Sequence, residues 1–147
     1  VGQVTRSQIE NSRALLLSLG LEDLRDRAFK SMSSGQQRRC LLGRALVHEP
    51  HTLVFDEPTA GLDLTASFDY LARIRDLARR GRSLVVVTHH LNEIPPEIER
   101  VIVLKSGAVV ADGAKSSVLC GPLLSGVYET PIGIIERDGH FMAYPVQ

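Results

Sequence analysis

Two short apolar segments that each end in polar side chains constrain the fold of this chain more than any other feature. Residues 52–57, TLVFDE, end in an acidic pair, and residues 83–90, SLVVVTHH, end in two histidines. Continuous apolar runs are typical of buried parallel strands, so we expect the second strand to be covered on both faces. The residues at 64–80 between them have helical spacing and stop at Gly81, which predicts a helix. Its apolar stripe consists of Leu64, Phe68, Leu71, Ile74 and Ala78. Strand, helix and strand in this order predict a right-handed βαβ unit with parallel strands.

Helices are predicted before this unit and β-hairpins after it. Residues 7–19 carry an apolar stripe and stop at Gly20, and the hydroxyl-rich residues 33–35 precede another apolar face. We therefore expect 33–35 at a helix N-terminus. Residues 100–113 and 132–146 alternate around Ser-Gly and Asp-Gly turns, which predicts two hairpins. The whole pattern predicts an α/β fold.

Polar side chains should converge where the two parallel strands end. The carboxyl ends of such strands form the ligand-binding edge of a sheet, so Asp56, Glu57, Thr88 and His89 are expected to lie close together. Two adjacent carboxylates need a cation opposite them. Asp56 is suited to hold Mg²⁺ through water, and Glu57 to deprotonate a water that attacks a terminal phosphate. His89 is placed to contact that phosphate. The alternative is an acidic strand edge that is simply solvated.

Four motifs in a fixed order resemble those of ATP-binding-cassette (ABC) ATPases. They are the signature MSSGQ at 32–36, the Walker B motif LVFDEP at 53–58, the D-loop AGLD at 60–63 and the switch histidine in VVTH at 86–89. The hairpin LKSGAVVADG also resembles the glycine-rich hairpin of the family, and the resemblance runs from about residue 15 to residue 113. The signature departs from its commonest form at Met32 and Ser34, which stand where leucine and glycine are usual.

The resemblance implies ATP and Mg²⁺ as cofactors and a head-to-tail pair of nucleotide-binding domains that clamp ATP between them. In this family Walker B and the switch histidine act in cis, while the signature and D-loop act on the partner's nucleotide. A helix N-terminus with serine and glycine agrees with a phosphate-facing role. The implied site residues are Glu57 and His89 for catalysis, Asp56 for the metal, Ser33, Gly35 and Gln36 for nucleotide binding in trans, and Asp63 at the D-loop interface.

The phosphate loop G-x-x-x-x-G-K-[ST] is not found in this sequence, because none of its 12 glycines precedes Lys-Ser or Lys-Thr. The glutamine loop is not found either, and the chain begins with Val1 instead of methionine. We therefore expect the C-terminal portion of one nucleotide-binding domain, inactive on its own. The expected parts are residues 1–50 (helical subdomain and signature helix), 51–113 (Walker B to switch histidine and hairpin) and 114–147 (C-terminal extension with a second hairpin). In the family the phosphate-loop strand lies between the strands at 83–87 and 101–104, so without it we expect either that these two strands close up or that a segment of another copy of the chain fills the gap.

Composition narrows the class of partner. Lys+Arg and Asp+Glu number 17 each, so no nucleic-acid partner is expected, and no apolar run approaches the ~20 residues of a membrane span. Two distant cysteines fit a reduced cytosolic setting.

We expect the energy-coupling ATPase subunit of an ABC transporter, cytoplasmic and docked on a membrane-spanning subunit. The alternatives are a soluble ABC ATPase of the translation, repair or chromosome type, and a naturally truncated interaction module. The D-loop AGLD, in place of the Asn-His-Leu-Asp common in the translation type, and the lack of heptads before the signature favour transport.

Several other polar residues are expected to be ordinary. His90 next to His89 suggests a metal pair, but neighbouring residues that leave a strand point apart. Arg38, Arg39 and Arg44 are expected to be solvated or ion-paired. The second hairpin has no predicted role beyond packing or regulation.

Overall fold

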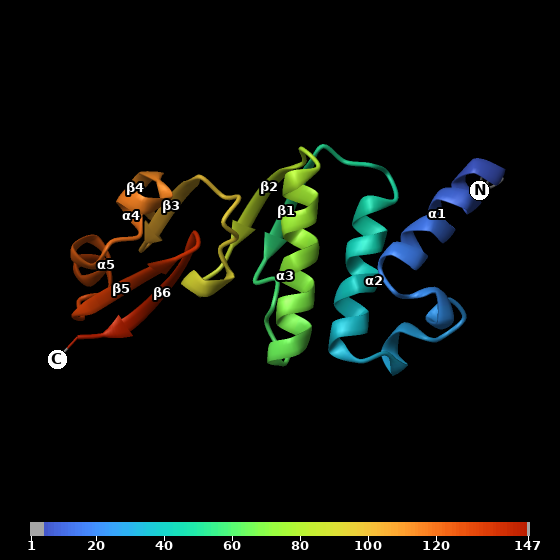
Figure 1. Cartoon of the computed structure of the whole chain (residues 1–147), viewed down its shortest axis with the longest axis horizontal. Helices are drawn as coiled ribbons and strands as arrows, with labels where there is room; N and C mark the ends of the chain where they lie inside the picture. The colour runs from blue at the N-terminus through green and yellow to red at the C-terminus, as the bar shows by residue number, and fades with distance from the viewer. Residues whose placement is uncertain (1–4, 147) are drawn as a thin grey trace.

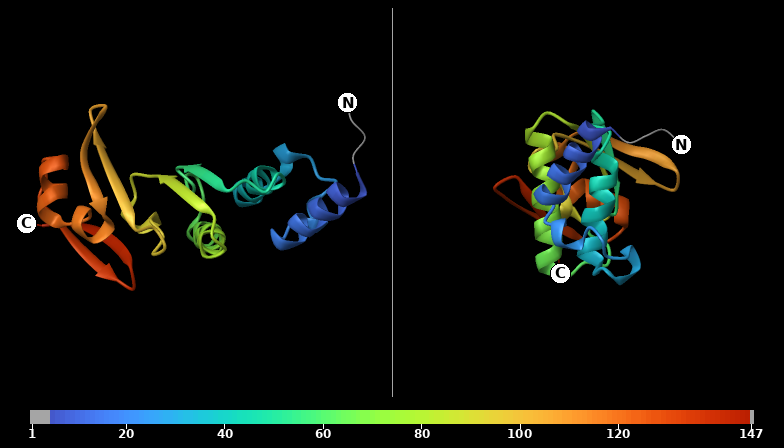
Figure 2. Two further views of the ribbon diagram at one scale, coloured as in Figure 1. Left: turned by 90° about the horizontal axis from the view of Figure 1, so that it is seen from above. Right: turned by 90° about the vertical axis from the view of Figure 1, so that its right-hand side faces the viewer.

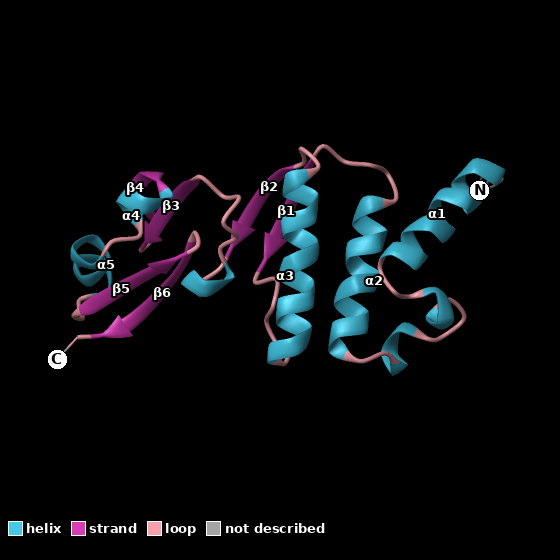
Figure 3. Cartoon of the chain, viewed as in Figure 1, coloured by secondary structure: helices cyan, strands magenta, loops and turns pink. Residues whose placement is uncertain are grey.

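The computed structural model of the chain describes residues 5–146 and is elongated, with helices at one end and β-hairpins at the other (Figures 1 and 3). Residues 1–4 and 147 lie outside the described residues. The first four belong to the part predicted as helical subdomain, including the Val1 noted above. The helices are α1 (Arg6–Ser18), α2 (Ser34–Leu46), α3 (Leu64–Arg79), α4 (Lys115–Val118) and α5 (Gly121–Tyr128), with short 3₁₀ turns η1 (Glu22–Leu24), η2 (Phe29–Ser31) and η3 (Leu91–Glu93). The strands are β1 (Thr52–Asp56), β2 (Ser83–Val87), β3 (Arg100–Lys105), β4 (Ala108–Ala114), β5 (Ile132–Arg137) and β6 (His140–Pro145).

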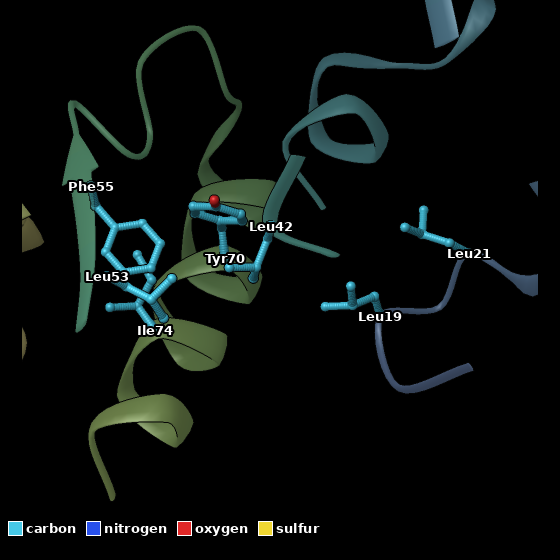
Figure 4. Close-up of a cluster of buried hydrophobic side chains, with 7 residues drawn as sticks. All are labelled: Leu19, Leu21, Leu42, Leu53, Phe55, Tyr70 and Ile74. Carbon is cyan, nitrogen blue, oxygen red and sulfur yellow. The ribbon is translucent and has the colours of Figure 1, made fainter. Parts of the chain in front are cut away.

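The predicted βαβ unit forms the middle of the molecule. Strands β1 and β2 are parallel, with Thr52 opposite Ser83 and Asp56 opposite Val87, and α3 connects them. One face of this two-stranded sheet packs on α3, as the left view of Figure 2 shows. The side chains at this contact include Leu53, Phe55, Tyr70 and Ile74 (Figure 4). The parallel strands and the intervening helix are therefore confirmed.

The same hydrophobic core continues into the N-terminal helices. Leu42 of α2 and Leu19 and Leu21, which follow α1, are buried with it (Figure 4). Helix α2 can approach this turn because residue 43 is glycine, since a Cβ there would lie 2.8 Å from Leu19 Cδ1. Helix α2 therefore packs against both α3 and the turn after α1 through this shared core.

The second face of the β1–β2 sheet is exposed, which corrects the expectation that both faces are covered. Val54 is 68% exposed, and Val85 and Val87 beside it are also exposed. Strand geometry sends these alternate side chains away from α3, and no element among residues 5–146 buries them. The predicted stripe of α3 is also partly wrong, because Leu64 and Phe68 are exposed. Leu71 and Ile74 of the stripe do lie in the core, together with Tyr70 and Leu77, which the prediction left out.

Both predicted hairpins are present. Strands β3 and β4 pair antiparallel, as do β5 and β6. The turn residues Ser106, Gly107, Asp138 and Gly139 all have positive φ, as tight hairpin turns require. Within the described residues each pair forms a sheet of its own, and β2 is not hydrogen-bonded to β3. The two strands therefore do not close up within the chain, which leaves the other expected outcome, filling of the gap by a second copy, as a prediction.

A second core joins the C-terminal elements to η3. Leu119, Leu124 and Phe141 are buried together, and Leu91 and Ile94 pack against them. Next to this cluster the buried Lys115 donates from Nζ to the carbonyl oxygens of three residues, at 3.0 to 3.1 Å: Pro95, Pro96 and Gly139. Burial lowers the pKa of Lys115, and the charges of Glu97 and Glu136 oppose that shift. The last hairpin is therefore fixed to the segment that follows β2. None of the helices between residues 5 and 146 is long and apolar enough to cross a bilayer.

Candidate functional site

The carboxyl ends of β1 and β2 lie side by side, and one further backbone hydrogen bond connects the two chain segments just beyond the end of β1. The backbone N–H of Glu57 donates to the carbonyl oxygen of Val87 at 2.8 Å. Glu57 has φ of 44°, in the left-handed region that non-glycine residues adopt rarely, and the fully buried Pro58 follows it. Such local strain persists only where the surroundings enforce it, and it is concentrated at functional sites. The Glu57 side chain is thereby turned out of the alternation of β1.

Glu57 and His89 meet at this edge. The Nδ1 atom of His89 lies 2.7 Å from Oε1 of Glu57. A carboxylate can only accept, so the imidazole carries its proton on Nδ1 toward Glu57 and presents Nε2 elsewhere. Glu57 is half-buried while the His89 ring is exposed, so the pair is open to an incoming ligand. The structure therefore brings together the two residues that the sequence proposed for catalysis.

A buried glutamate that the sequence did not single out lies behind this pair. Glu93 of η3 is 6% exposed and accepts hydrogen bonds from the hydroxyls of Thr59 and Thr88. The Thr88 bond is 2.7 Å long, and the Thr88 hydroxyl in turn accepts the N–H of His90 at 3.0 Å. Only Thr88 of these residues was expected at the site. The segment LNEIPP offers no signal for a buried acid, because its burial comes from contacts distant in sequence.

Asp56 is exposed at the end of β1, directly before Glu57. Mg²⁺ in phosphate sites is held by one or two carboxylates together with phosphate oxygens and water. A single exposed carboxylate at the ligand-binding edge suits that donor set. Among residues 5–146 no three or more His, Cys, Asp or Glu side chains are grouped to hold a metal unaided. The donor set present therefore fits an ion that arrives with a phosphate ligand.

The side chains of the two histidines after β2 were expected to point apart, but they lie against each other. Their ring centroids are 3.9 Å apart with an interplanar angle of 42°. The alternation rule applies within a strand, whereas here the chain has left β2 and bends, with the N–H of His90 bonded to Thr88. Contact between the rings supports the position of His89.

The signature residues form a second group at the start of α2. Ser33 is the N-cap: its Oγ accepts the N–H of Gln36 at 3.3 Å, and Gln36 Oε1 accepts the N–H of Ser33 at 2.9 Å. The N–H groups of Ser34 and Gly35 have no partner within the helix because they lie in its first turn. The Ser33 hydroxyl hydrogen and these two amides can together donate to an anion. The predicted position of this serine and glycine at a helix N-terminus is confirmed.

The D-loop connects the signature helix to α3. Asp63 caps α3 by accepting the N–H of Ala66 at 2.8 Å, and Gly35 approaches Ala66 so closely that a Cβ on it would lie 3.3 Å from the alanine Cβ. Arg38 Nη2 donates to the carbonyl oxygen of Ala60 at 3.1 Å. Arg38 thus has a specific contact beyond the solvated role expected from the sequence. The signature helix therefore contacts the D-loop and the start of α3 within one chain.

Comparison with known proteins gives a consistent result. A family model described as ABC transporter matches residues 5–60. An uncharacterized ABC transporter ATP-binding protein of Bacillus subtilis is 35% identical over 136 residues, which cover 90% of this chain and 52% of that protein. A hemin import ATP-binding protein of Nocardia farcinica is 39% identical over 136 residues, which cover 91% of this chain and 47% of that protein. The chain spans about half the length of the curated relatives it matches.

The fold is that of solved ABC proteins. A metal-chelate type ABC transporter in an inward-facing conformation superposes with a TM-score of 0.85 at 24% identity, over 99% of this chain and 60% of that chain. This similarity covers the helices, the βαβ unit and the hairpins. Together with the ordered motifs and the relatives, it supports the assignment of this chain to an ATP-binding-cassette ATPase domain.

Proposed function

We propose that this chain belongs to an ATPase subunit that powers an ABC transporter. It supplies the signature and the residues at the carboxyl ends of β1 and β2 that act in ATP hydrolysis. The observation that carries the proposal is the contact of 2.7 Å between Glu57 and His89 at the carboxyl ends of β1 and β2. Without a phosphate-loop sequence of its own, the chain alone should show no ATPase activity. The activity belongs to a full-length protein that combines these residues with a phosphate loop.

In this proposal Glu57 orients and deprotonates the water that attacks the terminal phosphate of ATP. The hydrogen bond from Nδ1 of His89 fixes the carboxylate, and Nε2 donates to an oxygen of the γ-phosphate when the ring carries a proton on both nitrogens. Asp56 would hold Mg²⁺, which neutralises the phosphate charge when bound. The three side chains thus have separate roles, with Glu57 accepting the proton, His89 contacting the phosphate and Asp56 binding the metal.

The second group acts on the nucleotide of a partner domain. Ser33, Gly35 and Gln36 lie at the start of α2, and the donors left free there, the Ser33 hydroxyl and the Gly35 N–H, suit the γ-phosphate of an ATP held by another subunit. Asp63 would then lie at the interface of a head-to-tail dimer. We further propose that residues 1–50, 51–113 and 114–147 are parts of one nucleotide-binding domain, which sits at the cytoplasmic side of a membrane-spanning subunit.

Transport is favoured over the other uses of ABC ATPases. The relatives described above are named as ATP-binding proteins of ABC transporters, and one of them is named for hemin import. A soluble ABC ATPase of the translation, repair or chromosome type is the second candidate, and the D-loop sequence AGLD argues against the translation type. Co-purification of the full-length protein with a membrane-spanning subunit that raises its ATP turnover supports transport, whereas co-purification with ribosomes supports the alternative.

The test of the hydrolytic site is Glu57→Gln in the full-length protein. The amide keeps the size of the side chain but cannot accept the proton, so turnover should fall by ~10²-fold or more while ATP binding survives. Glu99→Gln is a matched control, because Glu99 is an exposed glutamate that precedes β3 and lies outside the proposed site. Near-normal turnover in Glu57→Gln would refute the role of Glu57 as the base.

A further inference from the structure

The loop that carries His89 rests on a buried carboxylate that the proposed chemistry does not use. Glu93 is 6% exposed, and each of its two carboxylate oxygens accepts a hydrogen bond from a threonine hydroxyl. A buried carboxylate is costly unless its oxygens are satisfied, so both bonds are needed to keep it there. Glu93 is therefore strongly constrained to this one position.

The two hydroxyls belong to the two segments that make up the site. Thr59 lies two residues after Glu57, across the fully buried Pro58, and Thr88 lies directly before His89. The Thr88 hydroxyl also accepts the N–H of His90, which sets the bend of the chain after β2. One carboxylate thus links the loop after β1 to the loop after β2, on the buried side of the contact between Glu57 and His89.

Glu93 is held at its other end by the C-terminal elements. It is the last residue of η3, whose Leu91 packs with the following Ile94 against Leu119, Leu124 and Phe141. The next residues, Pro95 and Pro96, give their carbonyl oxygens to Lys115, which also binds the carbonyl oxygen of Gly139. The backbone of η3 is therefore fixed to the last hairpin, while its terminal carboxylate reaches the loops of the site.

We propose that Glu93 is a positioning residue that sets the placement of His89 relative to Glu57. It acts through the hydroxyls of Thr59 and Thr88, and the C-terminal core holds the backbone of η3 in place. The inference rests on the proposed ATPase function and assigns a role in that reaction to residues 114–146, which pack against η3. A displacement of either loop breaks one of the two bonds, so the two loops should move together.

The experiment measures ATP turnover, the KM for ATP and thermal stability in the full-length protein. Loss of a positioning contact at an active site can slow the reaction by ~10- to 100-fold, so Glu93→Ala should lower kcat by about tenfold or more with little change in KM. Thr88→Val removes one hydroxyl at constant shape and should lower kcat in the same direction. It also serves as the second variant if Glu93→Ala does not fold.

Two comparisons separate positioning from a merely structural role. Glu97→Ala is the matched control, because Glu97 is a mostly buried carboxylate four residues further on that pairs with Arg75 and Arg79 of α3. It should lower stability without lowering kcat. In a His89→Ala background Glu93→Ala should have little further effect on kcat, since its action passes through His89.

Four outcomes are informative. A selective loss of kcat that disappears in the His89→Ala background supports the proposal. A stability loss with unchanged kcat, as in the control, overturns it, and so does an equal fold-loss of kcat with and without His89. If Glu57→Gln leaves turnover intact, the proposed function fails first, and the two failures are thereby distinguished.

Discussion

The Nδ1 atom of His89 lies 2.7 Å from Oε1 of Glu57, which joins the ends of two strands whose last residues are 31 positions apart in the sequence (56 and 87). The contact depends on backbone features outside either side chain: the left-handed φ of Glu57 and the bend after Thr88. It lies at the carboxyl edge of a parallel sheet, where such folds place their ligands. The contact proposed to act in hydrolysis is thus a consequence of how β1 and β2 end.

The role of Asp63 can be divided into a cap and an interface contact. Asp63→Ala removes the acceptor for the N–H of Ala66 and should reduce the free energy of unfolding by about 1 kcal/mol, the usual worth of an N-cap. Asp63→Asn keeps the cap and should retain stability. If Asp63 also acts across a dimer, the asparagine variant should still hydrolyse ATP more slowly. Denaturant unfolding and turnover measured on both variants distinguish the two roles, and full activity in Asp63→Asn would leave only the cap.

The signature can be tested without disturbing its helix. Ser33→Asp retains an N-cap acceptor but places a negative charge where the partner's γ-phosphate is expected. Hydrolysis should fall by about tenfold or more, while ATP binding in the variant's own site persists. Ser33→Thr, which keeps the hydroxyl, is the control. Parallel loss of binding and hydrolysis in Ser33→Asp would contradict a role in trans.

Stability should depend on pH through Glu97, which pairs with Arg75 at 3.1 Å and Arg79 at 2.8 Å. Burial raises the pKa of Glu97, but the hydrogen bond to Arg75 and the two arginine charges outweigh it, so this pKa lies below the ordinary 4.5. The folded state therefore favours the charged form, and the stabilisation is complete above the unfolded-state pKa and is lost as pH falls through the folded-state pKa.

Glu97→Gln should accordingly cost about 1 kcal/mol at neutral pH, the upper range for a partly exposed pair. The difference from the unmodified protein should vanish in acid, below the folded-state pKa of Glu97. Thermal unfolding over a pH series is the measurement. A destabilisation that stays constant through the acid range would show that the carboxylate charge is not the source.

The 147-residue chain alone should self-associate through its exposed strands. Val54 is 68% exposed on the open face of the β1–β2 sheet, Val85 lies beside it, and β2 is not hydrogen-bonded to β3. Open edges and apolar faces of this kind promote strand addition between molecules. Light scattering should show oligomers that Val54→Lys with Val85→Lys reduces, while Ala72→Lys on the exposed side of α3 does not. A monodisperse monomer of the unmodified chain would contradict this.

Local patterns were enough to predict the framework and the convergence of Glu57 and His89 at one edge of the sheet, though not the hydrogen bond between them. Strand runs, turn residues and the serine before α2 identified the βαβ unit, the hairpins and the capped signature helix, because each depends on neighbours in sequence. The predictions were wrong where tertiary packing decides. Phe68 has helical spacing but is exposed, because the core covers Leu71 and Ile74 of the predicted stripe and leaves the first turns of α3 uncovered.

Glu93 shows the same limit at the site. An acidic residue in a polar loop is ordinarily solvated, and its burial here results from Thr59, which lies 34 residues away, and from the C-terminal core. The contact between the rings of His89 and His90 was likewise missed, because strand alternation was extended beyond the end of β2. Residues that link separate segments are therefore the ones that sequence patterns do not reveal.

The most direct test of the account is a double-mutant cycle on Glu57 and His89 in the full-length protein. ATP turnover is measured in the unmodified protein, Glu57→Gln, His89→Ala and the double variant, with ATP binding measured in each. Residues that act as one unit are strongly non-additive, so the double variant should be no more than about threefold slower than the slower single variant. Losses that multiply, or a single variant with normal turnover, would contradict the claim that these two residues form one hydrolytic unit.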